Sequence, residues 1–176
     1  KKKYPIGTVV KLDNMQGEKL PKGLKGKVTK VDDIGQIHVD WENGSSLALN
    51  AEVDSFYIVK EKMSILYIEP NKYPRVIEIE NTLEGMQSVV GGNIELLYPY
   101  DDEVALVCND EGKINGETLN RAIFDENGNV IDIIAGNFFI AYAPIESENL
   151  LSLPNNLKEK YFNIFQYPES FISTKN

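Results

Sequence analysis

The sequence is poor in the residues on which several common chemistries depend. Its 176 residues include one cysteine and one histidine, which excludes an intramolecular disulfide and argues against a zinc site of clustered cysteines and histidines. No stretch approaches the roughly 20 apolar residues that cross a bilayer. Pro5 and Gly7 stand where a signal peptide needs an apolar run. We therefore expect a soluble, intracellular protein.

Catalytic motifs are also missing. The sequence contains neither a glycine-rich phosphate-binding loop nor a Gly-x-Ser-x-Gly nucleophile motif. Gly91-Gly92 follows a predicted helix, so it suits a helix C-cap and not an anion-binding N-terminus. Asp101-Asp102 are neighbours in a turn, and the sequence places no second group for acid–base catalysis beside them. An enzyme stays possible but unsupported, and no cofactor or metal is predicted.

Charge is distributed unevenly along the chain. Residues 1–62 contain eleven lysines and nine acidic residues, whereas residues 63–176 contain seven basic and eighteen acidic residues. The change falls at the charged segment Lys60–Met63, which predicts a domain over residues 1–60 and an acidic domain over residues 63–176. A surface this acidic repels a phosphate backbone, so non-specific nucleic-acid binding is not expected.

Short alternating segments dominate the first domain. Lys27–Val31 and Gln36–Trp41 alternate apolar and polar residues on either side of a turn, which predicts a hairpin. Five short strands in about sixty residues, with glycine at the corners, favour a small closed β-barrel. The alternation places Trp41 on the inner face and leaves His38 exposed between carboxylates. Trp41 is interpreted as a core residue, with a ligand-binding platform as the alternative.

The patterns in the second domain follow the order β-β-α-β-β-β-β-β-α. Asn81-Thr82-Leu83-Glu84 has the form of a capping box with Asn81 as the cap, and Gly91 provides a stop, so a helix is predicted between them. Residues 157–165 are amphipathic and predict a second helix. Because most connections are short, we expect an α+β fold with an antiparallel-rich sheet and two helices packed on it.

Arginine is rare in this chain, which makes each arginine a candidate for function. Only Arg75 and Arg121 are present. The pair Asn120-Arg121 could form a fork for a phosphate or a carboxylate, with Asn120 reading a base or ribose edge. In the alternative, Asn120 caps a turn while Arg121 pairs with Asp110 or Glu111.

A ligand pocket around this pair would combine aromatic residues with convergent polar groups. Tyr98 and Phe138 lie near predicted strand ends, and Asn109-Asp110-Glu111-Gly112 forms an acidic turn. This turn lacks the ligand spacing of an EF-hand loop, so it is interpreted as a solvated turn, with a divalent-cation site as the alternative. The candidate ligand-binding residues are Tyr98, Asn109, Glu111, Asn120, Arg121 and Phe138.

Both halves of the chain resemble known families. Residues 23–28, 31–41 (with the run DDIGQIHV at 32–39) and 43–47 resemble a short SH3-like domain of unknown function from phages and conjugative elements of Gram-positive bacteria, over about residues 5–59. Residues 89–95, 106–113, 119–122 and 134–138 are similar to a second domain of unknown function from phages and mobile elements, over about residues 63–172. The resemblance implies an all-β SH3-like small barrel followed by the α+β domain, in the cytoplasm of a bacterial host. It implies no activity.

Three functions from different classes stay open. The first is a non-catalytic phage or mobile-element protein that binds and sequesters a small nucleotide signal and so counters a host defence. The alternative is an interaction module that blocks a host protein through its acidic surface. The third is a small enzyme acting on nucleotides, with Glu95, Asp110 and Glu111 as acids. We rank the first slightly ahead of the second; a homo-oligomer would help it by bringing two copies of Arg121 together.

Overall fold

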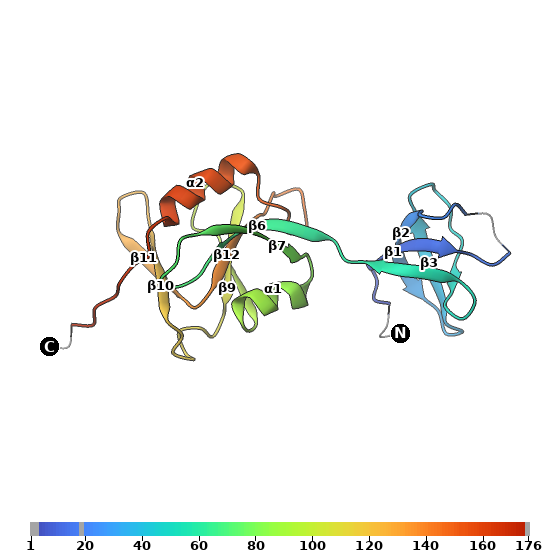
Figure 1. The fold of residues 1–176 in the computed structure, drawn as a ribbon, viewed down its shortest axis with the longest axis horizontal. Helices are drawn as coiled ribbons and strands as arrows, with labels where there is room; N and C mark the ends of the chain where they lie inside the picture. The colour runs from blue at the N-terminus through green and yellow to red at the C-terminus, as the bar shows by residue number, and fades with distance from the viewer. Residues whose placement is uncertain (1–3, 18–19, 175–176) are drawn as a thin grey trace. The chain divides into compact units, whose positions relative to one another are not determined.

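The computed structural model describes residues 4–17 and 20–174 and is mostly β, with antiparallel sheets and two helices among these residues. The chain divides into two compact units, Lys1–Lys60 and Glu61–Asn176, which run from blue to cyan and from cyan to red in Figure 1. Within the described ranges, neither helix has the length and apolar character needed to cross a membrane.

The first unit is one five-stranded antiparallel sheet in the order β4-β3-β2-β1-β5. Its strands are β1 (Val9–Asn14), β2 (Lys25–Val31), β3 (Gln36–Trp41), β4 (Leu49–Asn50) and β5 (Ser55–Val59). The closed barrel predicted from the sequence is wrong, because the described residues show no pairing between the outer strands β4 and β5. The reason is local. Asp54 accepts a hydrogen bond from the Asn50 amide, and the Asn50 carbonyl accepts from Asp54, so the chain turns after only two residues of β4.

One face of this sheet carries the core of the first unit. Trp41 is 2% exposed and its Nε1 donates to the Leu47 carbonyl at 2.8 Å, which confirms its prediction as a core residue. Gly26 lies opposite Trp41, and a Cβ atom at this position would stand 2.8 Å from the indole ring, so only glycine fits. His38 is half-buried, not exposed as predicted, because its Nε2 lies 3.1 Å from a carboxylate oxygen of Asp32.

The second unit follows the predicted order of strands and helices, which is confirmed. Its main sheet is antiparallel in the order β7-β6-β12-β9-β8, and a separate hairpin pairs β10 with β11. The elements are β6 (Lys62–Ile68), β7 (Arg75–Glu80), α1 (Leu83–Val90), β8 (Ile94–Leu97), β9 (Val104–Asn109), β10 (Leu119–Phe124), β11 (Val130–Ala135), β12 (Phe138–Tyr142) and α2 (Asn155–Phe165).

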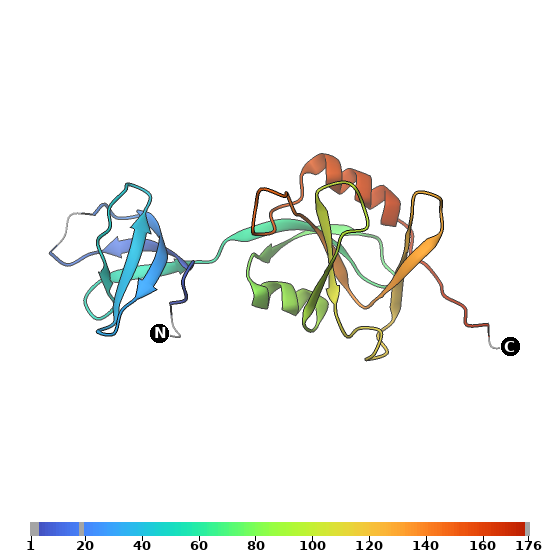
Figure 2. The same cartoon turned by 180° about the vertical axis from the view of Figure 1, so that it is seen from behind.

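The inner strands of the main sheet are buried on both faces. Figures 1 and 2 show α1 and α2 on opposite faces, and Figure 1 shows the β10–β11 hairpin beside α2. Neighbouring residues of β12 illustrate the consequence: Phe138 packs in the cluster that contains α2, whereas Phe139 packs in the cluster that contains α1. A strand covered on both faces needs a continuous apolar sequence, and all six residues of β9 are buried.

The start of α1 corrects one detail of the sequence prediction. Thr82, and not Asn81, is the N-cap, because the Thr82 hydroxyl accepts a hydrogen bond from the Gly85 amide at 3.0 Å. Asn81 instead donates from its side chain to the Leu150 carbonyl at 2.8 Å. The end of the helix is as predicted, with Gly91 in the left-handed region at φ 80°.

Candidate functional site

The predicted polar fork exists, but it lies inside the second unit. Asn120 and Arg121 are 0% and 1% exposed. Arg121 donates from Nε to the Phe165 carbonyl at 3.1 Å and from one terminal nitrogen to the Lys72 carbonyl at 2.7 Å. The other terminal nitrogen donates to the carbonyl and side-chain oxygens of Asn120. The guanidinium thus joins β10 to the end of α2 and to the β6–β7 loop.

The contacts of this pair differ from both sequence-based alternatives for Arg121. The guanidinium forms no ion pair with Asp110 or Glu111 in the described chain, and backbone carbonyls receive most of its hydrogen bonds. Burial lowers the pKa of Arg121, and the nearby Glu169 carboxylate opposes that effect. Asn120 donates to the Ile68 and Gly136 carbonyls at 3.0 and 2.8 Å, so it also joins separate segments.

The other predicted ligand residues do not converge on this pair. Phe138 is fully buried in the core, where its ring meets Phe165 edge to face at 5.5 Å. Asn109 is buried beside a cavity of about 290 Å³, accepts from the Glu111 amide at 2.9 Å and donates to Glu117 at 3.3 Å. Glu111 is exposed in the turn that follows β9. Tyr98 lies elsewhere, beside a larger cavity.

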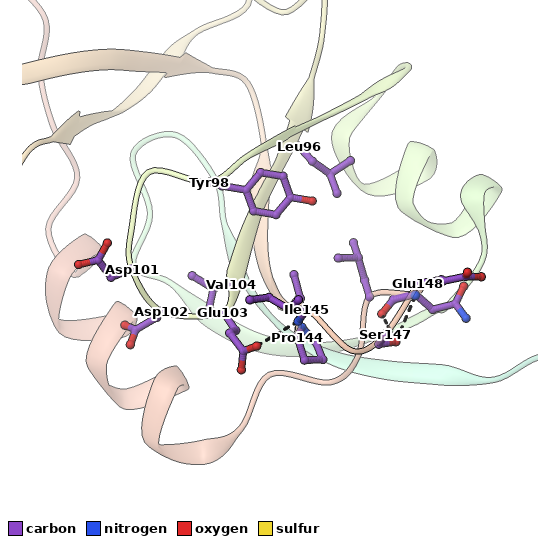
Figure 3. A pocket seen from close by; sticks show the side chains of 13 residues that line it. Leu96, Tyr98, Asp101, Asp102, Glu103, Val104, Pro144, Ile145, Ser147 and Glu148 are labelled. Atoms are coloured by element: carbon purple, nitrogen blue, oxygen red, sulfur yellow. Dashed lines mark hydrogen bonds between the residues drawn. The ribbon is translucent and has the colours of Figure 1, made fainter.

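That larger cavity, of about 420 Å³, is a cleft between the end of β8 and the loop that follows β12. Tyr98 is 63% exposed and Ile145 is 92% exposed, so two large apolar side chains of the same cleft are accessible to solvent. Figure 3 shows Leu96 and Tyr98 on one side, with Val104, Pro144 and Ile145 facing them. The lining residues are Leu96, Tyr98, Asp101, Asp102, Glu103, Val104, Ala143, Pro144, Ile145, Ser147, Glu148, Asn149 and Leu150.

Two distant residues hold the loop that forms one wall of the cleft. The Glu103 carboxylate accepts from the Ile145 amide at 3.0 Å and from the Tyr142 hydroxyl at 3.2 Å. At the other end of the loop, the Leu150 carbonyl accepts from Asn81. The loop is therefore fixed at both ends to the sheet and to the entrance of α1, and the cleft is pre-formed.

The acidic side chains of the cleft fall into two groups. Asp102 accepts from Lys160 and from the Tyr161 hydroxyl, and these hydrogen bonds lower the pKa of Asp102. Asp102 and Glu103 therefore have a structural role, because their carboxylates hold α2 and the loop after β12 in place. Asp101 and Glu148 are exposed, and neither has a hydrogen bond or ion pair from its side chain to another described residue. Figure 3 shows them at opposite ends of the cleft.

The cleft suits a ligand that is both apolar and positively charged. Its lining contains four carboxylates and no lysine, arginine or histidine. Carboxylates without internal partners attract ammonium and guanidinium groups, whereas they repel phosphates. Among the described residues, no group of three or more histidine, cysteine or acidic side chains is arranged to hold a metal ion.

Sequence reasoning found Tyr98 but missed the rest of this cleft. The sequence presents Asp101-Asp102 only as a candidate acid–base pair and indicates no function for residues 144–150. One sequence signal was available: Ile145 is an apolar residue within a short polar loop that carries Glu146 and Glu148.

The fold defines the second unit as a three-layer domain, with one helix on each face of its main sheet. Residues 63–166 match the family model named DUF3846, which is described as a domain of unknown function, and the chain belongs to that family. Residues 1–59 match a second model, DUF4314, also described as a domain of unknown function. No curated protein and no solved structure matches the chain.

Proposed function

We propose that this protein is a non-catalytic interaction module whose second unit binds a lysine- or arginine-bearing apolar segment of another protein. The observation that carries the proposal is the cleft beside Tyr98 and Ile145, where exposed apolar side chains lie between the unpaired carboxylates Asp101 and Glu148. An aromatic anchor beside polar rim groups is the usual composition of a protein-binding hot spot.

Nucleotide sequestration, which the sequence placed first, has less support from the geometry. A nucleotide signal carries phosphates, and the cleft has no cation among its lining residues. The cavity beside Asn109 is lined by Lys113, but this side chain forms an ion pair with Asp132. The donors of Arg121 face backbone carbonyls. Nucleotide binding is therefore tested as the competing function.

The resemblance to phage and mobile-element domains suggests what such a module would do in a host cell. In a phage or mobile element, an acidic module that captures a basic segment would occupy a host protein and block its normal contacts. We also propose that the first unit is related to SH3-like domains. This is supported by its small antiparallel sheet of five short strands, in which β1 pairs with β5.

The test uses the full chain and a peptide that alternates lysine and leucine, with a glutamate–leucine peptide as the opposite-charge control. We expect NMR shift changes centred on Tyr98 and Ile145 with the lysine peptide only. Asp101→Asn with Glu148→Gln should weaken binding roughly two- to thirtyfold, because each exposed ion pair contributes about 0.2–1 kcal/mol. Tyr98→Ala should weaken it by about tenfold or more.

A matched control keeps the change in net charge constant. Glu126→Gln with Glu159→Gln removes two exposed carboxylates that do not line the cleft, and this variant should bind like the unmodified chain. Equal losses in both double variants would reduce the effect to bulk charge and overturn the proposal. A thermal-shift panel of cyclic dinucleotides belongs to the same test. Stabilisation by a nucleotide, with no response to the lysine peptide, would restore sequestration as the function.

A further inference from the structure

The outward positions of β2, the central strand of the first sheet, are dominated by lysine. Lys25, Lys27 and Lys30 are all exposed, while Gly26 and Val28 between them are buried. The pairing register extends this pattern across the sheet. Lys11 of β1 lies directly opposite Lys25, and Tyr57 of β5 lies opposite Lys11. We call the outward side chains of Lys11, Lys25, Lys27, Lys30 and Tyr57 the lysine face.

The Lys11–Lys25 pair contradicts the usual rule for cross-strand neighbours. Residues directly opposite each other have Cβ atoms about 5 Å apart, and like charges at such positions destabilise a sheet. Lysines on edge strands protect against edge-to-edge pairing, but β1 and β2 are both interior strands in the order β4-β3-β2-β1-β5. Local rules of this kind are broken mainly at functional sites.

The charges of this face are only partly balanced within the described residues. None of Lys11, Lys25, Lys27 and Lys30 forms an ion pair or side-chain hydrogen bond there. Asp40, opposite Lys27, is the carboxylate that the register places nearest to them. Asp13 at the end of β1 is already paired with Lys22 at 2.7 Å. The face thus has a positive excess although the unit as a whole is only weakly basic.

Tyr57 adds a second feature to the face. Its ring is 60% exposed on an outer strand and lies in register beside Lys11. A row of cations that follows a sugar–phosphate backbone, with an aromatic ring on which bases stack, is the common composition of single-strand binding surfaces. A duplex would need an element that enters a groove, whereas this site is the outward face of a sheet.

We propose that the lysine face binds single-stranded nucleic acid. The lysines contact phosphates and Tyr57 stacks on a base. This differs from the expectation drawn from the net charge of the chain, because the strand register gathers these lysines on one face of the first sheet. The site is independent of the acidic cleft and of the function proposed for it.

The test measures fluorescence anisotropy of a labelled thymidine oligonucleotide of about 20 nucleotides with the full chain. We expect binding at about 50 mM salt, with log K falling against log salt with a slope near −3, since four neutralised phosphates contribute about −0.7 each on a single strand. Lys11→Gln with Lys25→Gln should reduce the slope by about 1.4. Tyr57→Ala should weaken binding about 5- to 100-fold.

Matched measurements make the proposal falsifiable. Lys62→Gln with Lys158→Gln changes the net charge equally, in the second unit, and should leave binding unchanged. The melting temperature of Lys11→Gln with Lys25→Gln should stay constant or rise, so lost binding cannot be attributed to unfolding. Absence of binding at low salt, tighter binding of a duplex, or equal competition by polyglutamate would overturn the proposal. The last result would assign the face to an acidic protein.

Discussion

The two units of this chain use antiparallel sheets in opposite ways. The first unit buries one face of its sheet and leaves the other to solvent, so β2 alternates between lysine and core residues. The second unit covers both faces of its main sheet, so β9 is buried throughout. The same contrast separates their charges. The first unit displays lysines on its central strand β2, whereas the second has no charged residue in its inner strands β9 and β12 and carries carboxylates on outer strands and in loops. The number of covered faces therefore decides where each unit can present charged groups.

The largest expected effect tests the contrast between one covered face and two. Phe138→Ala and Phe139→Ala remove neighbouring side chains that point into different cores, and each should lower the free energy of unfolding of the second unit by about 3–5 kcal/mol. In β2, Val28→Ala should destabilise while Lys27→Ala changes stability by less than about 0.5 kcal/mol. Denaturant unfolding followed by circular dichroism measures all four.

Trp41 lets the two units be followed separately. It is the only tryptophan and it is buried in the first unit, so its fluorescence should follow unfolding of that unit and stay unchanged in the Phe138 and Phe139 variants. A tolerated substitution at either phenylalanine would contradict the two-face packing. Phe138→Ala also separates a core role from the ligand role that the sequence suggested.

The next largest effect concerns the buried arginine. Arg121→Met should destabilise the second unit by about 3 kcal/mol or more, because it leaves the Phe165 and Lys72 carbonyls without their donors. Arg121→Lys should not restore stability, since an ammonium group cannot reproduce the planar set of donors. Arg75→Ala is the control. Arg75 is largely exposed and pairs with Glu69, so its loss should cost less than about 1 kcal/mol. Similar values for the two arginines would refute the joining role of Arg121.

A smaller effect distinguishes the scaffold carboxylates of the cleft from its unpaired ones. Hydrogen bonds from Lys160 and Tyr161 lower the pKa of Asp102 in the folded state. Asp102 therefore stabilises the fold above its unfolded pKa near 3.8, and this contribution is lost as the pH falls through the lower, folded pKa. Asp102→Asn should cost about 1 kcal/mol or less at neutral pH and nothing in strong acid. Asp101, exposed and without a hydrogen bond or ion pair to another described residue, is the control. Asp101→Asn should change the free energy of unfolding by less than about 0.5 kcal/mol at neutral pH, and denaturant unfolding compares the two variants.

The smallest expected effect is a gain in stability. Lys25→Gln removes the repulsion from Lys11 and should stabilise the first unit by about 0.2–1 kcal/mol. Lys27 lies opposite Asp40, so Lys27→Gln should not stabilise the first unit. Thermal unfolding followed by Trp41 fluorescence measures the stability of both variants. A loss of stability in Lys25→Gln would show that Lys11 and Lys25 do not repel each other in the folded chain.

Much of the fold could be predicted from the periodicity of apolar residues in the sequence. The order of elements in the second unit, the stop at Gly91 and the inward face of Trp41 were all predictable, because they depend on local patterns of period two or 3.6. The open sheet of the first unit was not predictable in the same way. Whether β4 reaches β5 depends on the turn that Asp54 forms with Asn50, and several turn geometries fit the same residues.

The candidate site was harder to predict than the fold. Tyr98 and the Pro144–Leu150 loop are far apart in sequence and meet because β8, β9 and β12 are neighbours in one sheet. The rarity of Arg121 suggested a ligand, yet rarity carries no information about burial. A guanidinium can serve a phosphate or three backbone carbonyls equally well, and only its surroundings decide between them.

The sequence by itself determined the two units, their strands and helices, and the absence of the common catalytic motifs, because these depend on composition and on residues close along the chain. The tertiary structure decided which charges are available. It placed Arg121 inside, joined Asp102 and Glu103 to the scaffold, left Asp101 and Glu148 beside exposed apolar side chains, and aligned Lys11 with Lys25. Burial and strand register arise from contacts between distant segments, so they cannot be read from any single stretch of sequence.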